Sequence, residues 1–126
     1  MIGGLVALKV DPNIMAKLAG QRMSMIVTGT NGKSTTTRMA ANALRTAYTV
    51  ATNDGGDNMD AGIVSALNQD LDADAICLEV DEMHVPHVMD ALSPTVLVLL
   101  NLSRDQLDRV GEINTIERRL REAVAA

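Results

Sequence analysis

A glycine-rich segment, Thr28-Gly29-Thr30-Asn31-Gly32-Lys33-Ser34-Thr35, carries the strongest chemical signal in the chain. Small residues let backbone N–H groups approach phosphate oxygens, and a helix that follows such a turn presents its positive N-terminus to the same anion. The Lys33 ammonium would then reach the β and γ phosphates, and the Ser34 hydroxyl would bind Mg²⁺. The segment therefore predicts a site for ATP and Mg²⁺, with an ordinary glycine turn as the alternative.

The segment departs from the common phosphate-loop pattern at one position. That pattern has Gly at the place that Val27 occupies here. Gly29 preserves the turn, and the segment lies between an apolar run and a helical pattern, which is the context that a phosphate loop needs. The residues predicted to bind the nucleotide are Gly29, Thr30, Asn31, Gly32, Lys33, Ser34 and Thr35, together with Asn101.

Acidic residues follow the apolar run 75–78. The first of them, Glu79, is predicted to complete the Mg²⁺ site with Ser34, because Mg²⁺ takes one or two carboxylates in addition to phosphate oxygens and waters. Asp81 either shares the face of Glu79 or caps the next helix, and Glu82 falls in the first turn of that helix. A purely structural pair of acids is the alternative.

Polar residues also follow the second apolar run, 96–100, where Asn101 and Asp105 stand. In an open parallel sheet, ligands bind beyond the carboxyl ends of the strands. We therefore expect both residues to lie near the glycine-rich segment. Lys33, Glu79 and Asp105 form the predicted catalytic set.

Two histidines and one asparagine allow more than one interpretation. His84 and His87 are three positions apart on a predicted helix, but the sequence shows no third ligand nearby. Solvent-facing or supporting roles are therefore favoured over a metal site. Asn58 ends the loop 53–58 and is either the N-cap of the next helix or a ligand contact.

Two further features are interpreted as structural. Cys77 stands inside an apolar run, which favours a buried and inert thiol over a nucleophile. The charged run 117–122 favours a solvated helix face, on which Glu117 and Arg121 have the order of an i,i+4 ion pair.

Apolar runs and helical spacing alternate along the chain. A helix is expected to open at Asp11, as its N-cap, and Pro12 and to stop at Gly20. After it, strands are predicted at 23–28, 48–52, 75–80 and 95–100, and helices at 33–47, 59–68, 82–92 and from about 113 onward. The alternation predicts an α/β fold, a parallel sheet of about four strands with helices on both faces.

Composition limits the remaining possibilities. The 126 residues suit one domain, and the near absence of aromatic residues predicts a core of Val, Ile, Leu, Ala and Met. The net charge of -5 argues against nucleic acid as a partner. The chain has neither a signal-peptide pattern nor an apolar run long enough to span a membrane, so a cytoplasmic location is predicted.

These motifs resemble the Mur ligase family, whose central domain carries a Thr-Gly-Thr-Asn-Gly-Lys-Thr/Ser loop. Within the family, the chain most resembles the MurT-type subunit of lipid II isoglutaminyl synthase. Four stretches support it, namely 7–13, the phosphate loop, 79–82 and, most specifically, 101–112. Related peptidoglycan ligases have His where this chain has Gln106, and they place a uridine-nucleotide-binding domain before the loop.

The resemblance implies a domain division and a reaction. Residues 1–22 would form a lead-in helix, and residues 23–126 the N-terminal part of the ATP-binding central domain. ATP would phosphorylate the α-carboxylate of D-glutamate in lipid II, and ammonia from a glutaminase subunit of the GatD type would attack the acyl phosphate. A zinc ribbon is implied only in a part of the family's length that this chain lacks. We expect ligation to need those further parts.

Two alternatives to this reaction stay open. The chain could belong to another Mur-type ligase, one acting on muramyl peptides or on folylpolyglutamate. It could also be a nucleotide-binding module without turnover, whose incomplete sheet leaves an exposed edge strand that favours self-association.

Overall fold

A four-stranded parallel sheet forms the centre of the molecule. The computed structural model describes residues 2–54, 57–102 and 110–126. The strands are β1 (Met23–Thr28), β2 (Val50–Thr52), β3 (Ala75–Glu79) and β4 (Val96–Leu99), in the order β2-β3-β1-β4. In this register Val27 of β1 lies beside Glu79 of β3, and Thr28 lies beside Leu99 of β4. The predicted α/β fold with a parallel sheet of about four strands is confirmed.

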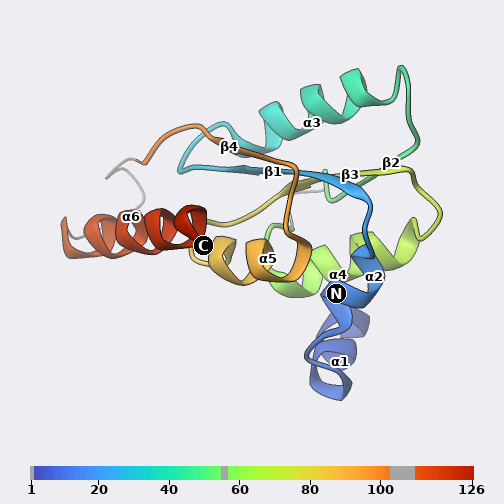
Figure 1. Cartoon of the computed structure of the whole chain (residues 1–126), viewed down its shortest axis with the longest axis horizontal. Helices are drawn as coiled ribbons and strands as arrows, with labels where there is room; N and C mark the ends of the chain where they lie inside the picture. Colours follow the sequence, from blue (N-terminus) through green and yellow to red (C-terminus); the bar gives the residue numbers. More distant parts are fainter. Residues whose placement is uncertain (1, 55–56, 103–109) are drawn as a thin grey trace.

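Helices cover both faces of the sheet, as expected. They are α1 (Ile2–Val10), α2 (Ile14–Ala19), α3 (Lys33–Leu44), α4 (Asp60–Gln69), α5 (Val85–Leu92) and α6 (Val110–Ala125). Helix α3 lies on one face, whereas α2, α4 and α5 lie on the other, and α1 projects away from the sheet (Figure 1). Because α3 begins directly after β1, the turn between them lies at the carboxyl end of the sheet.

The core is aliphatic. Its larger cluster joins the sheet to α2, α4, α5 and α6 and includes the strand residues Ile26, Ile76 and Leu78. A smaller cluster, which includes Ala41 of α3 and Cys77 of β3, lies between α3 and the sheet. Methionine contributes less than predicted. Met15 is fully buried, but four other methionines, Met23, Met39, Met59 and Met83, are exposed.

The N-terminal segment differs from its prediction. It contains two helices, and α2 starts at Ile14 rather than at Pro12. Asp11 does not cap α2. Its carboxylate instead accepts hydrogen bonds from the Asn13 N–H at 3.0 Å and from the Lys17 ammonium at 2.5 Å, and the Lys17 bond lowers the pKa of Asp11.

Helices α1 and α2, which occupy the predicted lead-in segment, pack into the same core as the rest of the chain. A Cβ placed on Gly4 of α1 would lie 2.2 Å from the Ala61 carbonyl oxygen of α4, so only glycine permits this close approach. Farther on, the Arg22 guanidinium donates to the carbonyls of Leu18, Ala19, Asp70 and Ala73. It thereby joins the end of α2 to the turn before β3.

Several element boundaries also need correction. Helix α3 ends at Leu44 rather than at residue 47, and α6 begins at Val110 rather than at about residue 113. Helix α4 has Met59, not Asn58, at its N-cap position, and α5 begins at Val85 rather than at Glu82. Strand β2 begins at Val50 rather than at Tyr48. Turns occupy residues 82–84 because the Asp81 carboxylate accepts the Met83 N–H at 3.1 Å, which closes a local turn before the helix.

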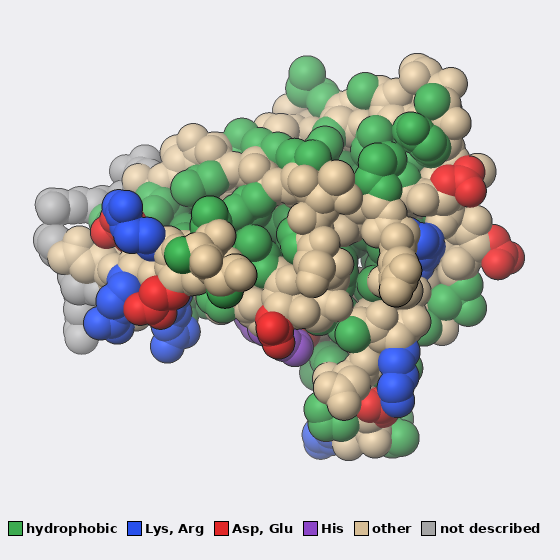
Figure 2. Space-filling view, viewed as in Figure 1, with side chains coloured by type: hydrophobic (Ala, Val, Ile, Leu, Met, Phe, Trp, Pro, Cys, Tyr) green, Lys and Arg blue, Asp and Glu red, His purple; other side chains and the backbone are tan. Residues whose placement is uncertain are grey.

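Strand β4 lies at one edge of the sheet and is the most exposed of the four strands. Val96 and Leu99 are 41% and 51% exposed. Beside β4, a groove of about 390 Å³ separates the strand from α6, and Leu97, Leu99, Leu102, Leu120 and Val124 line it. Hydrophobic side chains are visible on the surface between α6 and the sheet (Figure 2).

Candidate functional site

The glycine-rich turn joins β1 to α3. Gly29 has a φ of 140° and Gly32 a φ of 88°, conformations that L side chains rarely adopt. A Cβ on Gly29 would also lie 3.0 Å from the backbone N and O of Asn101. Lys33, Ser34 and Thr35 form the first turn of α3, where a helix supplies no acceptor for its own N–H groups. The local geometry therefore suits an anion.

Lys33 lies over this turn. Its side chain is 10% exposed, and its ammonium donates to the Gly29 carbonyl at 2.5 Å and to the Thr30 carbonyl at 3.4 Å. The Glu82 carboxylate lies 3.5 Å from the same ammonium. Glu82 therefore faces the loop lysine, a contact that the expectation of a helical first turn did not anticipate.

Ser34 and Glu79 meet across the carboxyl end of the sheet. The Ser34 Oγ lies 3.0 Å from Glu79 Oε1 and 2.9 Å from Oε2. Glu79 is 3% exposed, whereas Ser34 is exposed. A hydroxyl and a carboxylate at this distance, directly beside a helix N-terminus, are oxygen donors of the kind that Mg²⁺ prefers. The side chains present thus fit the Mg²⁺ site predicted from the sequence.

Two asparagines of the β2–α4 loop hold Glu79. Asn53 is buried, and its side-chain amide contacts both backbone polar groups of Glu79. Asn58 donates from its Nδ2 to Glu79 Oε1 at 3.4 Å, and its carbonyl accepts the Asp81 N–H at 2.9 Å. Asn58 therefore contacts the candidate metal carboxylate instead of capping α4. Sequence reasoning considered the loop 53–58 but gave Asn53 no role of its own. The signal for Asn53 was its place directly after the predicted strand 48–52.

Asn101 holds the turn from the side of β4. Its Oδ1 accepts the Asn31 N–H at 3.0 Å, its Nδ2 donates to the Asn31 carbonyl at 2.9 Å, and its own carbonyl accepts the Thr30 N–H at 2.9 Å. Asn101 was predicted to contact the nucleotide, and these contacts give it a role in shaping the loop. Asp105, also predicted for the site, lies outside the described residues.

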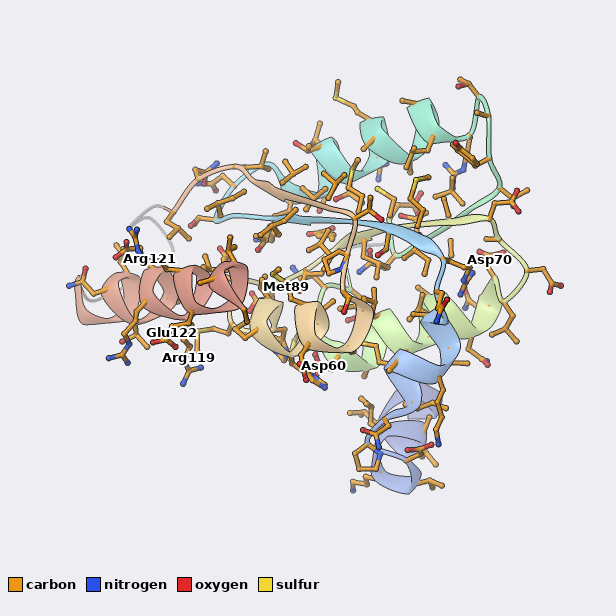
Figure 3. All side chains as sticks on the ribbon, viewed as in Figure 1. Asp60, Asp70, Met89, Arg119, Arg121 and Glu122 are labelled. Atoms are coloured by element: carbon orange, nitrogen blue, oxygen red, sulfur yellow. The ribbon has the colours of Figure 1, made fainter. Side chains whose placement is uncertain are left out.

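His84 and His87 meet a third polar residue that the sequence did not indicate. Their Nδ1 atoms lie 2.9 Å and 2.6 Å from the two carboxylate oxygens of Asp60, the first residue of α4. Asp60 lies on the outer side of the layer formed by α4 and α5, away from α3 (Figure 3). Within residues 2–54, 57–102 and 110–126, no group of three or more His, Cys, Asp or Glu side chains is arranged to hold a metal ion.

Cys77 is free and fully buried under α3, as its apolar context predicted. Burial raises the pKa of its thiol to about 11, against a small opposing effect from the positive charge of Arg45. The thiol therefore stays protonated at neutral pH. On α6, Arg121 pairs with Glu117 in the predicted i,i+4 arrangement.

Comparison with known proteins places this geometry in a family. The family model of the Mur ligase middle domain matches residues 27–122. The chain belongs to the Mur ligase family. The turn before α3 and both residues of the Ser34–Glu79 contact lie within the matched residues, and the family assignment made from the motifs is confirmed.

Curated relatives narrow the comparison. The chain is 36% identical over 126 residues to the MurT subunit of lipid II isoglutaminyl synthase (glutamine-hydrolyzing) from Streptococcus pneumoniae R6, covering 96% of this chain and 28% of the relative. The MurT subunit from Staphylococcus aureus COL is also 36% identical, with 97% and 29% covered. The chain thus spans less than a third of the length of these relatives.

Similarity over a shorter part of the chain extends to ligases of another name. The UDP-N-acetylmuramoylalanine–D-glutamate ligase of Nitrobacter winogradskyi is 41% identical over 88 residues, which cover 69% of this chain and 18% of that enzyme.

Among the described residues, no helix is long and apolar enough to cross a membrane.

Proposed function

We propose that this chain is the nucleotide- and Mg²⁺-binding part of an ATP-dependent ligase that amidates the D-glutamate α-carboxylate of lipid II. The ammonia would come from a glutaminase subunit, and the carboxylate would be activated as an acyl phosphate. The names of the MurT relatives, which include lipid II and glutamine hydrolysis, support this substrate and partner. A cytoplasmic location stays a prediction.

One observation carries the nucleotide part of the proposal. The Ser34 hydroxyl contacts both oxygens of the buried Glu79 carboxylate at the N-terminus of the helix that follows the glycine-rich turn. Backbone N–H groups of that first turn supply positive partial charge for a phosphate group. The same small region therefore offers partners for the phosphates and for the divalent cation that accompanies them.

The residues of the site would act by position and charge. Lys33 would stabilise negative charge on the transferring phosphoryl group, and Glu79 and Ser34 would hold the Mg²⁺ ion. When bound, Mg²⁺ neutralises charge on the phosphate oxygens. Asn101 would keep the Thr30–Asn31 peptides in place, and Asp105 would act at the neighbouring strand end, a role assigned to it from the sequence.

A ligase that adds D-glutamate to a muramyl peptide is the second candidate. It is favoured by the identity of 41% to the Nitrobacter winogradskyi enzyme over 88 residues. Gln106 argues against it, because the related peptidoglycan ligases that the motifs resemble have His there. An assay with lipid II, glutamine and the glutaminase subunit separates the two candidates, since only the amidating reaction needs a glutaminase.

The binding step can be tested on the chain itself. We expect Lys33→Ala to reduce Mg²⁺-dependent ATP binding by about 100-fold, because a charge-assisted contact to phosphate is lost. Isothermal titration calorimetry measures the change. Lys17→Ala is the matched control, since it removes an exposed ammonium that pairs with Asp11. Equal affinities for Lys33→Ala and the unmodified chain would refute the proposed nucleotide site.

A further inference from the structure

The side chain of Asn53 forms hydrogen bonds with the backbone N–H and C=O of Glu79, which have no partner strand on that side of β3. The β2–β3 ladder ends with Thr52 beside Cys77, so main-chain pairing on that side stops before Glu79. Asn53 Oδ1 accepts the Glu79 N–H at 2.8 Å, and Asn53 Nδ2 donates to the Glu79 carbonyl at 2.7 Å. The side-chain amide thus continues the ladder beyond the end of β2.

The opposite side of the strand is held by main chain. Val80 donates its N–H to the Val27 carbonyl at 2.9 Å, so β1 fixes the peptide that follows Glu79. The backbone around Glu79 is therefore held on both sides, by a main-chain hydrogen bond to β1 and by the side-chain amide of Asn53 in the β2–α4 loop. Since residue 79 is 3% exposed, its N–H and C=O have little access to water if that amide is removed.

Asn is the residue type that fits this place. Its short planar amide presents one acceptor and one donor side by side, which is the complement of a backbone N–H and C=O. An isosteric Asp side chain retains an acceptor for the N–H but turns a second acceptor toward the carbonyl. Asn53 Nδ2 also donates to the Asp57 carbonyl at 2.7 Å, so the same amide anchors the loop that delivers Asn58 to Glu79 Oε1.

We propose that Asn53 is a positioning residue for the Mg²⁺ carboxylate: by fixing the backbone of Glu79, it sets the place of that carboxylate opposite the Ser34 hydroxyl. This inference rests on the proposed function, in which Ser34 and Glu79 hold the ion. Asn53 itself touches neither the nucleotide nor the ion. Its removal should therefore weaken the Mg²⁺-dependent part of nucleotide binding and spare the part that the loop provides alone.

The test measures binding of a non-hydrolysable ATP analogue to the chain in Mg²⁺ and in EDTA. Partners that orient a metal ligand typically contribute about 10- to 100-fold to metal affinity, so we expect Asn53→Ala to raise the Mg²⁺ concentration for half-maximal binding by about tenfold. Binding in EDTA should change by less than about twofold. Asn42→Ala, an exposed asparagine on α3, is the matched control and should change neither.

A double-mutant cycle separates positioning from general destabilisation. If Asn53 acts through Glu79, Asn53→Ala combined with Glu79→Gln binds Mg²⁺ no more weakly than Glu79→Gln alone. Additive losses would overturn the inference. Asn53→Asp keeps the side-chain volume, and circular dichroism identifies which variants are folded. A folded Asn53→Asp with an unchanged Mg²⁺ response would also overturn it.

The result also distinguishes this inference from the proposed function. If the unmodified chain binds the analogue equally well in Mg²⁺ and in EDTA, the Mg²⁺ site and the role of Asn53 both fail. If the unmodified chain depends on Mg²⁺ and Asn53→Ala and Asn53→Asp depend on it equally, only the inference about Asn53 fails.

Discussion

Strands β3 and β4 pair with opposite sides of β1, yet they end in different surroundings. Each residue of β3 is buried, and the strand ends at the buried Glu79. Each residue of β4 is partly or largely exposed, and the strand leads to the exposed Asn101. The candidate metal carboxylate is thus part of the core, whereas Asn101, which supports the glycine-rich turn, lies at the surface.

Because of this difference, substitutions at the end of β3 should affect both stability and binding, whereas substitutions at the end of β4 should affect chiefly binding. A change near Glu79 disturbs buried hydrogen bonds and core packing together with the proposed Mg²⁺ site. A change at Asn101 removes contacts to the loop and leaves the core intact. Substitutions on the two strands should therefore have effects of different size and kind.

The largest difference is expected in stability. Leu78 of β3 is fully buried, and Leu78→Ala should lower the free energy of unfolding by about 3 kcal/mol, because it leaves a cavity in the main core. Leu99 of β4 is 51% exposed, and Leu99→Ala should cost about 1 kcal/mol or less. Urea denaturation measures both. Equal costs would contradict the distinction between the strands.

A second effect is a pH dependence that comes from β3. Because the pKa of the Cys77 thiol is raised from 9.0 to about 11, the unfolded chain loses this proton at a lower pH than the folded chain. The stabilising contribution is complete below pH 9.0 and is lost as the pH rises toward about 11. The loss should reach roughly 2 kcal/mol.

Comparison with Cys77→Ala isolates this contribution from other groups that titrate at high pH. The free energy of unfolding of the unmodified chain should fall more steeply between pH 9 and 11 than that of Cys77→Ala. Parallel pH profiles would show that the thiol has no such effect.

The smallest effect is expected at the β4 end. Asn101→Ala removes the two side-chain hydrogen bonds to Asn31. The two hydrogen bonds together contribute about 1 kcal/mol, so nucleotide binding should weaken by roughly fivefold, equally in Mg²⁺ and in EDTA. The melting temperature should hardly change because Asn101 is exposed. A selective loss in Mg²⁺ would instead link Asn101 to the ion and remove the contrast with Asn53.

Much of the fold could be predicted because each element depends on local pattern. The continuous apolar runs at β3 and β4 indicated parallel strands, and the glycines at 29 and 32 indicated the turn that their positive φ angles require. Capping was harder to predict. Asp11 and Asn58 have the residue types of helix N-caps, but neither side chain caps a helix. The Asp11 carboxylate instead accepts a hydrogen bond from Lys17, and the Asn58 amide donates one to Glu79.

The sequence by itself determined the alternation of strands and helices and the membership of the Mur ligase family, and it located the glycine-rich turn that we propose binds phosphate. Only the tertiary structure showed that Asn53 grips Glu79, that Glu82 faces Lys33 and that Asp60 joins His84 and His87. The physical reason is distance along the chain. Local patterns reflect neighbours within a few residues, whereas these partners are 24 to 49 residues apart and meet only when the strands have paired and the helices have packed on the sheet.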